Sequence, residues 1–365
     1  MRTMKILYII TSLEMGGAEK LVVDMLPRLR EKGHEVELLT FSGKRTPLYQ
    51  KIEQEGVKIH HFGVNAKMYN PMNVLKLASF LKHNRYDIVH THNTAPQLFA
   101  AIASVLCSVV LCTTEHNTSN RRRNWKWYVP LDRWMYRQYQ SIVCISDQAE
   151  INLKAYLGKG KYAISTIYNG IDVKSFANAA PSDELLMQKG NRKAIVMVAG
   201  FRYEKDQDTL IKAMTYLPKN GYELWLVGDG KRRENLEQLI KNLKLEQQVK
   251  MLGLRNDVPQ ILKASDVVVM SSHFEGLSLS NLEGMSVGKP FIASDVDGLR
   301  EVVKGYGVLF SHGNAEELAS EIQHLATDEK YSQQVASKCW QRAQMFDIEK
   351  MVESYEKVYK SLIPS

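Results

Sequence analysis

The sequence predicts an α/β protein with two domains, each built on a parallel sheet covered by helices. Short apolar runs alternate with stretches of helical periodicity along the chain, a pattern typical of strand–helix–strand units. The chain has 365 residues, enough for two domains that each bury a core. The segment Asp172 to Arg192 interrupts the alternation near the middle and is expected to be the linker.

The expected elements follow the apolar runs in order. In the first half, strands are predicted at 4–10, 35–41, 58–63, 87–92, 109–115, 141–146 and 162–168, with helices starting near Ala18, Asn73, Ala95, Trp125 and Asp147. In the second half, strands are predicted near 194–200, 222–228, 249–253, 266–271, 290–294 and 307–310, with helices starting near Asp208, Arg232, Val258, Leu279 and Ala315. Pro27 should kink the first helix, and the chain should be helical after Lys330.

The composition is that of an ordinary globular protein, with 44% hydrophobic and 24% charged residues. The longest apolar stretch, Leu98 to Cys112, contains too many small and polar residues for a membrane span. The first predicted strand follows the first residues of the sequence so closely that no signal peptide is expected. The four cysteines include no C-x-x-C pair and are expected to be reduced, which indicates a cytoplasmic protein.

Two carboxylates in the second half, Glu275 and Glu283, are the most informative feature. The run 266–270 predicts a buried strand, the glycine after Glu275 a turn, and 278–287 a helix. A strand, a turn and a helix start together present free backbone N–H groups, which suit a phosphate. The carboxylates can accept hydrogen bonds from hydroxyl pairs on either side of that phosphate, so this layout fits a nucleotide sugar.

Glu283 also has a simpler interpretation. The run Ser280 to Glu283 has the sequence of a capping box, in which Glu283 would bond only to the start of its own helix. Capping explains neither Glu275 nor the strand before it, so the combination favours a ligand site.

Three other strand ends carry candidate residues. Gly16 and Gly17 open the first helix, where a phosphate could approach the bare backbone. His116 closes the strand 109–115 and should point toward a ligand site rather than the core. Arg202 and Lys205 follow the first strand of the second half and could neutralise a diphosphate. The structural alternatives are a simple turn, a core histidine and a surface ion pair.

The ordered set of motifs resembles the retaining GT-B glycosyltransferases of family four, over essentially the whole chain. The resemblance rests on Gly16-Gly17, on Asn169-Gly170-Ile171-Asp172, and on the E-x7-E block with its trailing G-K-P-F-I-A-S-D. It implies a GT-B fold, in which two Rossmann-like domains face each other across a deep cleft. Residues 1–172, with about 346–365, would form the acceptor-side domain, and 173–345 the nucleotide-sugar domain.

The resemblance also implies roles. Glu275 would orient the donor sugar and His116 would contact it near the reacting carbon, which makes them the expected catalytic residues; His90 and His92 are weaker, acceptor-side candidates. The residues expected to bind the donor are Gly16, Gly17, Arg202, Lys205, Leu254, Arg255, Leu279, Ser280 and Glu283. One departure stands out: aligned on Lys205, the family's usual arginine falls on Gly200, so Arg202 would have to reach the phosphate from a shifted place.

No metal or other cofactor is expected. Asp295-Val296-Asp297 imitates the D-x-D metal motif of the other major glycosyltransferase fold, but here it should shape the turn before Gly298. Lys205, Arg202 and helix-start amides would meet the diphosphate charge instead.

The net charge of +8 is concentrated between Arg121 and Arg137, where basic residues alternate with tryptophans. This pattern suits a helix at an anionic membrane surface, although a solvated amphipathic helix would have the same sequence. Because no nucleic-acid motif accompanies the charge, nucleic acid is not an expected partner.

The sequence thus predicts a retaining, metal-independent hexosyltransferase in bacterial surface polysaccharide biosynthesis. Its substrates would be a nucleotide sugar, with UDP favoured, and a glycan or lipid-linked acceptor, and it would be cytoplasmic or peripheral at the inner membrane face. A UDP-sugar 2-epimerase-like isomerase and an inactive nucleotide-sugar-binding subunit remain alternatives. The donor sugar, the acceptor and the linkage stay open.

Overall fold

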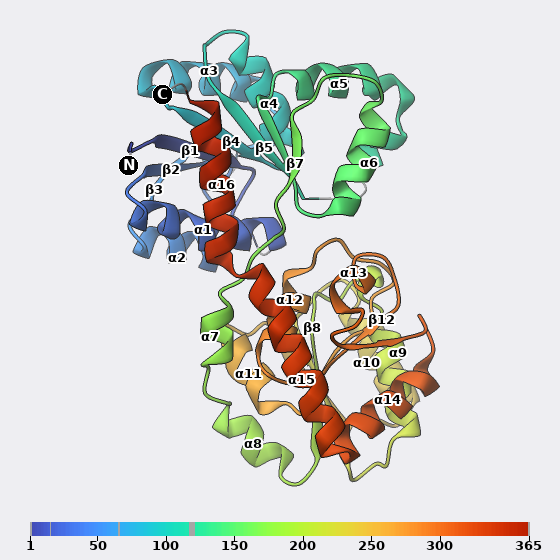
Figure 1. The fold of residues 1–365 in the computed structure, drawn as a ribbon. Coiled ribbons are helices and arrows are strands. Elements are labelled where there is room, and N and C mark those ends of the chain that lie inside the picture. Colours follow the sequence, from blue (N-terminus) through green and yellow to red (C-terminus); the bar gives the residue numbers. More distant parts are fainter. Residues whose placement is uncertain (1, 15, 65, 117–120, 364–365) are drawn as a thin grey trace. The chain divides into compact units, whose positions relative to one another are not determined.

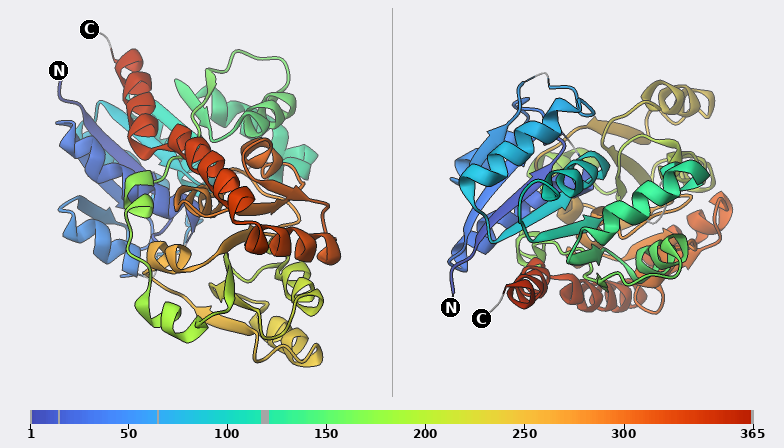
Figure 2. Two further views of the ribbon diagram at one scale, coloured as in Figure 1. Left: turned by 60° about the horizontal axis from the view of Figure 1, so that its bottom comes forward. Right: turned by 90° about the horizontal axis from the view of Figure 1, so that it is seen from above.

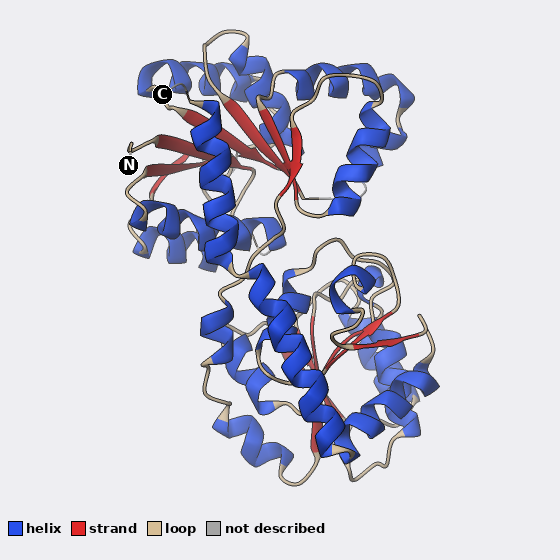
Figure 3. Cartoon of the chain, viewed as in Figure 1, coloured by secondary structure: helices blue, strands red, loops and turns tan. Residues whose placement is uncertain are grey.

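A computed structural model describes residues 2–14, 16–64, 66–116 and 121–363. The chain divides into two compact units, one formed by 1–169 with 348–365 and the other by 170–347. Each unit contains a parallel sheet with helices on its faces (Figures 1 and 3). The predicted boundaries, at 172/173 and about 345/346, lie close to this division.

The first unit has the strand order β3–β2–β1–β4–β5–β6–β7, with all neighbours parallel. Its strands are β1 Lys5–Ile10, β2 Glu35–Thr40, β3 Lys58–His61, β4 Ile88–His92, β5 Leu111–Glu115, β6 Ser141–Cys144 and β7 Ile164–Thr166. Its helices are α1 Gly17–Glu31, α2 Pro47–Gln54, α3 Met72–Asn84, α4 Thr94–Ser104, α5 Val129–Arg137, α6 Asp147–Leu157 and α16 Ile348–Leu362, with short 3₁₀ turns at Arg121–Asn124 and Lys126–Tyr128.

Strand β1 shows why this sheet is buried on both faces. Leu7 and Ile9 join the core that α3, α4, α5 and α6 cover. Tyr8 points to the opposite face, where its hydroxyl contacts Met25 of α1 and Tyr359 of α16. A parallel sheet covered by helices on both faces requires such continuous apolar strands.

The second unit has the order β10–β9–β8–β11–β12–β13, again with parallel neighbours. Its strands are β8 Lys193–Val198, β9 Tyr222–Val227, β10 Val249–Gly253, β11 Val267–Met270, β12 Phe291–Ser294 and β13 Val308–Phe310. Its helices are α7 Val173–Ala177, α8 Asp183–Lys189, α9 Gln207–Ala213, α10 Arg233–Asn242, α11 Val258–Ala264, α12 Leu279–Ser286, α13 Arg300–Val303, α14 Ala315–Thr327 and α15 Glu329–Ala343, with 3₁₀ turns at Tyr203–Lys205, Met214–Tyr216 and Gln344–Phe346. Figure 2 gives two further views of these helices.

The strand order reverses direction between β1 and β4 in the first unit and between β8 and β11 in the second. In open α/β sheets, ligands bind beyond the carboxyl ends of the strands at such a switch point. The loops after β8 and β11 are therefore where a ligand site is expected.

The predicted strands are all present, but the predicted linker is wrong. The segment Asp172 to Arg192 forms α7 and α8, which belong to the second unit. Its backbone is tied there because the Ser182 N–H donates to the carbonyl of Gln260, and Leu185 is buried. Helix α2 was also missed, although Thr46 caps its first turn by accepting from the Tyr49 N–H.

Candidate active site

Lys205 and Glu275 form an ion pair at the switch point of the second sheet. Lys205 lies in the loop after β8 and Glu275 in the loop after β11, and their side chains are only 20% and 9% exposed. Ser272 adds a hydrogen bond of 2.7 Å from its hydroxyl to Glu275 Oε1. The structure thus brings together two predicted site residues that are 70 positions apart in sequence.

The loop that carries Glu275 is supported from behind by a glycine. Gly298 has φ +81°, and a Cβ at this position would collide with the Glu275 carbonyl. The Glu275 N–H approaches the Asp297 carbonyl at 3.4 Å. A residue with a side chain could not allow this approach, so Gly298 fixes the position of the Glu275 backbone.

The two aspartates of the D-x-D sequence contact one arginine. Arg300 Nε lies 2.5 Å from Asp295 Oδ1, and Arg300 Nη1 lies 3.2 Å from Asp297 Oδ1. Both carboxylates are therefore paired with one guanidinium in the turn that ends at Gly298.

Glu283 is buried in helix α12, with 5% of its surface exposed. The helix begins at Leu279 with Ser278 as N-cap, so Ser280 is its second residue and Glu283 its fifth. A capping box needs the serine at the N-cap and the glutamate three residues later. The capping-box interpretation is thus wrong for Glu283, while Leu279 and Ser280 do lie at the helix start as predicted.

Asn281, also in the first turn of α12, is a candidate that the sequence analysis missed. It is fully buried, and among the described residues neither polar atom of its amide has a hydrogen-bond partner. Such groups are rare in folded proteins and call for an explanation. Its position beside the predicted phosphate-binding amides makes it a candidate donor contact.

Arg202 is exposed, and no ion pair to it is found among the described residues. Its Nε lies 3.6 Å from the place that a Cβ on Gly200 would occupy. The guanidinium therefore folds back over the position where the resembled family carries its arginine. The binding of a phosphate by Arg202 stays a prediction.

Arg255 is not available as a free cation. Its Nε and Nη2 donate to the two oxygens of Asp257 at 2.8 and 2.7 Å, and this bidentate pair raises the Arg255 pKa. Leu254 beside it is 65% exposed. The resemblance implies that this loop binds through its backbone, and this stays a prediction.

In the first unit, Gly16 is the N-cap of α1 and Gly17 its first residue. The space around the Gly17 Cα is open, but a side chain on Gly16 would collide with the carboxylate of Glu19. Asn93 holds that carboxylate with a hydrogen bond of 3.1 Å from its Nδ2. Gly17 is thus the more accessible of the two glycines.

His116 follows β5, as predicted, and is bonded to His92. The distance from His92 Nδ1 to His116 Nε2 is 2.8 Å. Burial lowers the pKa of His116 to about 4, so its ring is neutral at neutral pH. His116 can therefore donate or accept one hydrogen bond but does not supply a positive charge.

His90 and His92 are both fully buried, so neither reaches an acceptor directly. His90 bonds to the Tyr359 hydroxyl at 2.5 Å and to Thr114 Oγ1 at 2.8 Å. Burial lowers the pKa of His90 to about 3 and that of His92 well below its usual value. His90 is a structural link to α16, and the expectation of an acceptor-side role for it is wrong.

Two of the arginines expected at a membrane surface are internal. Arg122 is 5% exposed, and its Nε lies 3.1 Å from Asp132 Oδ2. Arg123 Nη2 lies 3.3 Å from Glu115 Oε2. These two side chains neutralise buried carboxylates and cannot bind lipid headgroups; the side chain of Arg121 lies outside the described residues.

Two of the three tryptophans of the same stretch are exposed, while Trp134 is half-buried against the core. Trp125 is 51% and Trp127 73% exposed, and their rings stack at 5.8 Å with an interplanar angle of 8°. Lys126, between them in sequence, and Arg133 of α5 are also exposed. Trp125 and Trp127 are therefore exposed, as a membrane-surface role requires, whereas Arg122 and Arg123 are not. No helix among the described residues is long and apolar enough to span a membrane.

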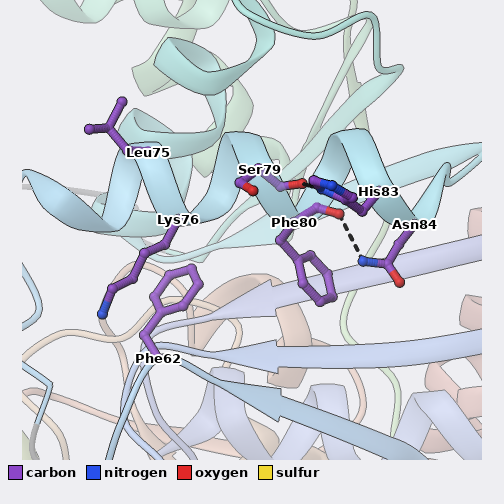
Figure 4. Close-up of a pocket in the computed structure, with 7 residues that line it drawn as sticks. All are labelled: Phe62, Leu75, Lys76, Ser79, Phe80, His83 and Asn84. Carbon is purple, nitrogen blue, oxygen red and sulfur yellow. Dashed lines mark hydrogen bonds between the residues drawn. The ribbon is translucent and has the colours of Figure 1, made fainter.

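A pocket in the first unit lies apart from these residues. It is lined by Phe62, Leu75, Lys76, Ser79, Phe80, His83 and Asn84 (Figure 4). Its polar groups bond within their own helix: His83 Nδ1 lies 2.7 Å from the Ser79 carbonyl, and Asn84 Nδ2 donates to the Phe80 carbonyl at 2.8 Å. The pocket holds none of the predicted site residues.

Two family models match the chain in succession. Residues 15–175 match the model described as Glycosyltransferase Family 4, and residues 184–340 match Glycosyl transferases group 1. The fold and these matches define the protein as a glycosyltransferase with the GT-B fold. More narrowly, the chain belongs to the family 4 type of glycosyltransferase.

Relatives and solved structures agree with this assignment. An Escherichia coli UDP-Gal:alpha-D-GlcNAc-diphosphoundecaprenol alpha-1,3-galactosyltransferase is 29% identical over 80% of this chain and 79% of its own length. The N-acetyl-alpha-D-glucosaminyl L-malate synthase of Bacillus anthracis is 26% identical over 96% of this chain and 95% of its own. Among solved structures, Anabaena HepE in complex with UDP has a TM-score of 0.85 at 24% identity, covering 98% of this chain and 100% of that one.

Proposed function

We propose that this glycosyltransferase moves a hexose from a UDP-sugar to a lipid-linked glycan, with retention of configuration, in the assembly of a bacterial surface polysaccharide. The observation that supports it most is the Lys205–Glu275 pair at the β8/β11 switch point, next to the start of α12. A diphosphate needs a cation and free amides, and a sugar needs an acceptor of hydrogen bonds. This corner of the second unit supplies all three.

The donor is assigned group by group. Glu283 accepts from the ribose hydroxyls, Lys205 and Arg202 neutralise the diphosphate, and the amides near Leu279 and Ser280 complete its shell. Glu275 accepts from the hexose hydroxyls. The resemblance assigns further contacts with the hexose to His116 and Gly17. UDP is favoured because a relative's name specifies UDP-Gal and HepE binds UDP and UDP-glucose.

The reaction follows from these contacts. The bond between the anomeric carbon and the diphosphate oxygen breaks, and the acceptor oxygen forms a new bond to that carbon on the same face. The acceptor proton goes to the departing diphosphate oxygen, so no strong base of the protein is needed. Lys205, Arg202 and the helix-start amides stabilise the charge that develops on the leaving group, and the transfer requires no metal.

The acceptor is assigned from two observations. The Escherichia coli relative acts on a diphosphoundecaprenol-linked sugar, as its name states. Trp125 and Trp127 are exposed and flanked by Lys126 and Arg133, a combination that suits the headgroup region of an anionic bilayer. We therefore place the enzyme at a membrane surface through its aromatic stretch rather than through Arg122 and Arg123.

The donor is tested with a thermal-shift panel of UDP-, GDP- and ADP-hexoses. A bound donor stabilises the folded form by mass action, so a UDP-hexose should raise the melting temperature. The Lys205→Met variant should lose this shift. Lys189→Met is the matched control, since Lys189 also pairs with a carboxylate, Asp266, in the same unit. A shift with GDP-hexoses alone would contradict the assignment of uridine.

The reaction class is tested by proton NMR of a time course with donor and a lipid-linked acceptor. An α-linked product from an α-configured donor is the expected result, and a β-linked product would overturn retention. A parallel sample without acceptor should show no epimerised sugar, because an epimerised sugar would indicate an isomerase.

Membrane binding is tested by co-sedimentation with vesicles of phosphatidylglycerol. The double variant Trp125→Ala, Trp127→Ala should remain in the supernatant, while the wild type sediments. The control is Trp340→Ala, which removes a tryptophan that is 42% exposed on α15 in the other unit. Equal sedimentation of the wild type and both variants would contradict membrane binding through Trp125 and Trp127.

A further inference from the structure

A second cluster of functional side chains lies at the carboxyl edge of the second sheet. Asp206 follows β8, His273 follows β11 and His312 follows β13. The three residues offer ligand atoms that lie within 4.8 Å of one another. His273 Nδ1 is 2.6 Å from His312 Nε2 and 3.7 Å from Asp206 Oδ2. None of these residues has a role in the proposed transfer.

The distances between these ligand atoms are close to those around a bound metal ion. Zinc bound to imidazole and carboxylate at about 2.0–2.2 Å in a tetrahedral arrangement has ligand atoms about 3.3 Å apart. The two measured distances lie on either side of this value. At 2.6 Å, one imidazole must donate a hydrogen bond to the other. A metal ion would replace the shared proton and bind the lone pairs of both nitrogens.

The first two ligands are held in place by their surroundings. Asp206 is only 4% exposed, and its Oδ2 accepts a hydrogen bond of 2.6 Å from the Thr209 hydroxyl. The backbone N–H of His273 donates to the Glu204 carbonyl at 2.9 Å and fixes the main chain there, and the His273 ring packs on that of Tyr203 with centroids 4.6 Å apart. Such outer contacts orient metal ligands and are typical of built sites.

The third ligand stands in a closed turn. The Asn314 N–H donates to the Ser311 carbonyl at 2.9 Å, and Gly313 takes φ +76° within this turn. His312 is exposed, so its ring can rotate toward the ideal ligand spacing without disturbing the core. The site therefore needs only a small adjustment of one surface side chain.

We propose that Asp206, His273 and His312 bind one divalent transition-metal ion of the Zn²⁺ or Co²⁺ class, with water in the fourth position. Imidazole and carboxylate ligands suit these ions, whereas Mg²⁺ and Ca²⁺ prefer oxygen ligands alone. The ion links the loops after β8, β11 and β13, close in sequence to Lys205 and Glu275. The ion is bound by these loops and takes no part in sugar transfer, so this proposal does not depend on the proposed function.

The test uses full-length protein without a histidine tag, stripped with EDTA and dialysed. Titration calorimetry with Zn²⁺ should give one ion per chain, and Co²⁺ should produce the visible absorption of a tetrahedral complex. His312→Gln removes an exposed ligand without affecting the core and should weaken Zn²⁺ binding at least about tenfold. Asp206→Asn should weaken it as well, with circular dichroism to confirm that the variant is folded.

The matched control is His324→Gln. His324 Nε2 lies 4.0 Å from Asp328 Oδ2 on the protein surface, and this pair offers two ligand groups rather than three. This variant should bind Zn²⁺ like the wild type. Absence of stoichiometric binding, full binding by His312→Gln, or an equal loss in His324→Gln would each overturn the proposal. Because no nucleotide is present, none of these outcomes depends on donor binding.

Discussion

The imidazole of His92 lies 2.8 Å from that of His116, and this bond determines how His116 presents itself. The other ring nitrogen of His92, Nε2, is buried without a partner among the described residues. A buried N–H without a partner is rarer than an unpaired lone pair, so the His92 proton belongs on Nδ1. It donates to His116 Nε2, which leaves the His116 proton on Nδ1.

Replacing His92 should therefore reduce turnover more than binding. His92→Phe keeps a ring of similar size but frees both the orientation and the tautomer of His116, and we expect kcat to fall about tenfold with little change in donor KM. His92→Gln, which keeps a donor, should restore part of the rate. Nitrogen NMR of His116 should show mixed tautomers in His92→Phe, and an unchanged spectrum would contradict this role.

Glu275→Gln should separate nucleotide binding from transfer. In the free protein, Glu275 neutralises Lys205, so removing its charge leaves the ammonium free for the diphosphate. Calorimetry should show that the affinity for UDP is unchanged or up to about tenfold higher than in the wild type, while the rate of transfer falls. Weaker UDP binding in Glu275→Gln would show that the carboxylate supports the nucleotide rather than the sugar.

Glu283→Gln should weaken UDP binding. A hydrogen bond to a charged group contributes about 1.5–3 kcal/mol, which corresponds to roughly a tenfold or greater loss of affinity. The control is Glu237→Gln, which alters a surface pair with Arg233 and should change neither affinity nor stability. Unchanged UDP affinity together with a lower melting temperature would make Glu283 a structural residue.

The stability of the fold should fall as the pH drops below about 6.5, the ordinary histidine pKa. Burial gives His90 a folded-state pKa of about 3 and His116 one of about 4, and it lowers the pKa of His92 far below its usual value. The unfolded chain therefore binds three protons that the folded chain rejects, so stability rises with pH in this window, with a slope of up to about 4 kcal/mol per unit.

Urea unfolding between about pH 7.5 and pH 5 measures this slope, above the range in which carboxylates titrate. His90→Gln should lower the slope by about a third, whereas His324→Gln, at a site that is 53% exposed, should leave it unchanged. The same slope in His90→Gln and wild type would show that buried histidines are not its source.

Sugar transfer should survive EDTA. The diphosphate charge is assigned to Lys205, Arg202 and the amides at the start of α12, and this assignment leaves no charge for an ion to neutralise. Activity should therefore be the same before and after chelation in a radiochemical transfer assay. Activity that is lost with EDTA and returns with Mn²⁺ or Mg²⁺ would overturn the metal-independent mechanism.

The sequence by itself determined the two-unit α/β architecture and the strands, because buried parallel strands leave long apolar runs that few other structures share. It also located Glu275, Glu283, Lys205 and His116, because strand ends and glycine turns are local signals. The linker was placed wrongly because α7 and α8 are short helices, stabilised by packing on the second unit rather than by their own periodicity.

Only the tertiary structure decided which side chains meet. The pairing of Lys205 with Glu275 and the convergence of Asp206, His273 and His312 join segments far apart in the chain. The burial of Arg122 against Asp132 and of Arg123 against Glu115 joins nearby segments, but it depends on how these segments pack. The sequence does not show which charged residues pair, because a cation and a carboxylate that are distant in sequence become neighbours only through the order of the strands.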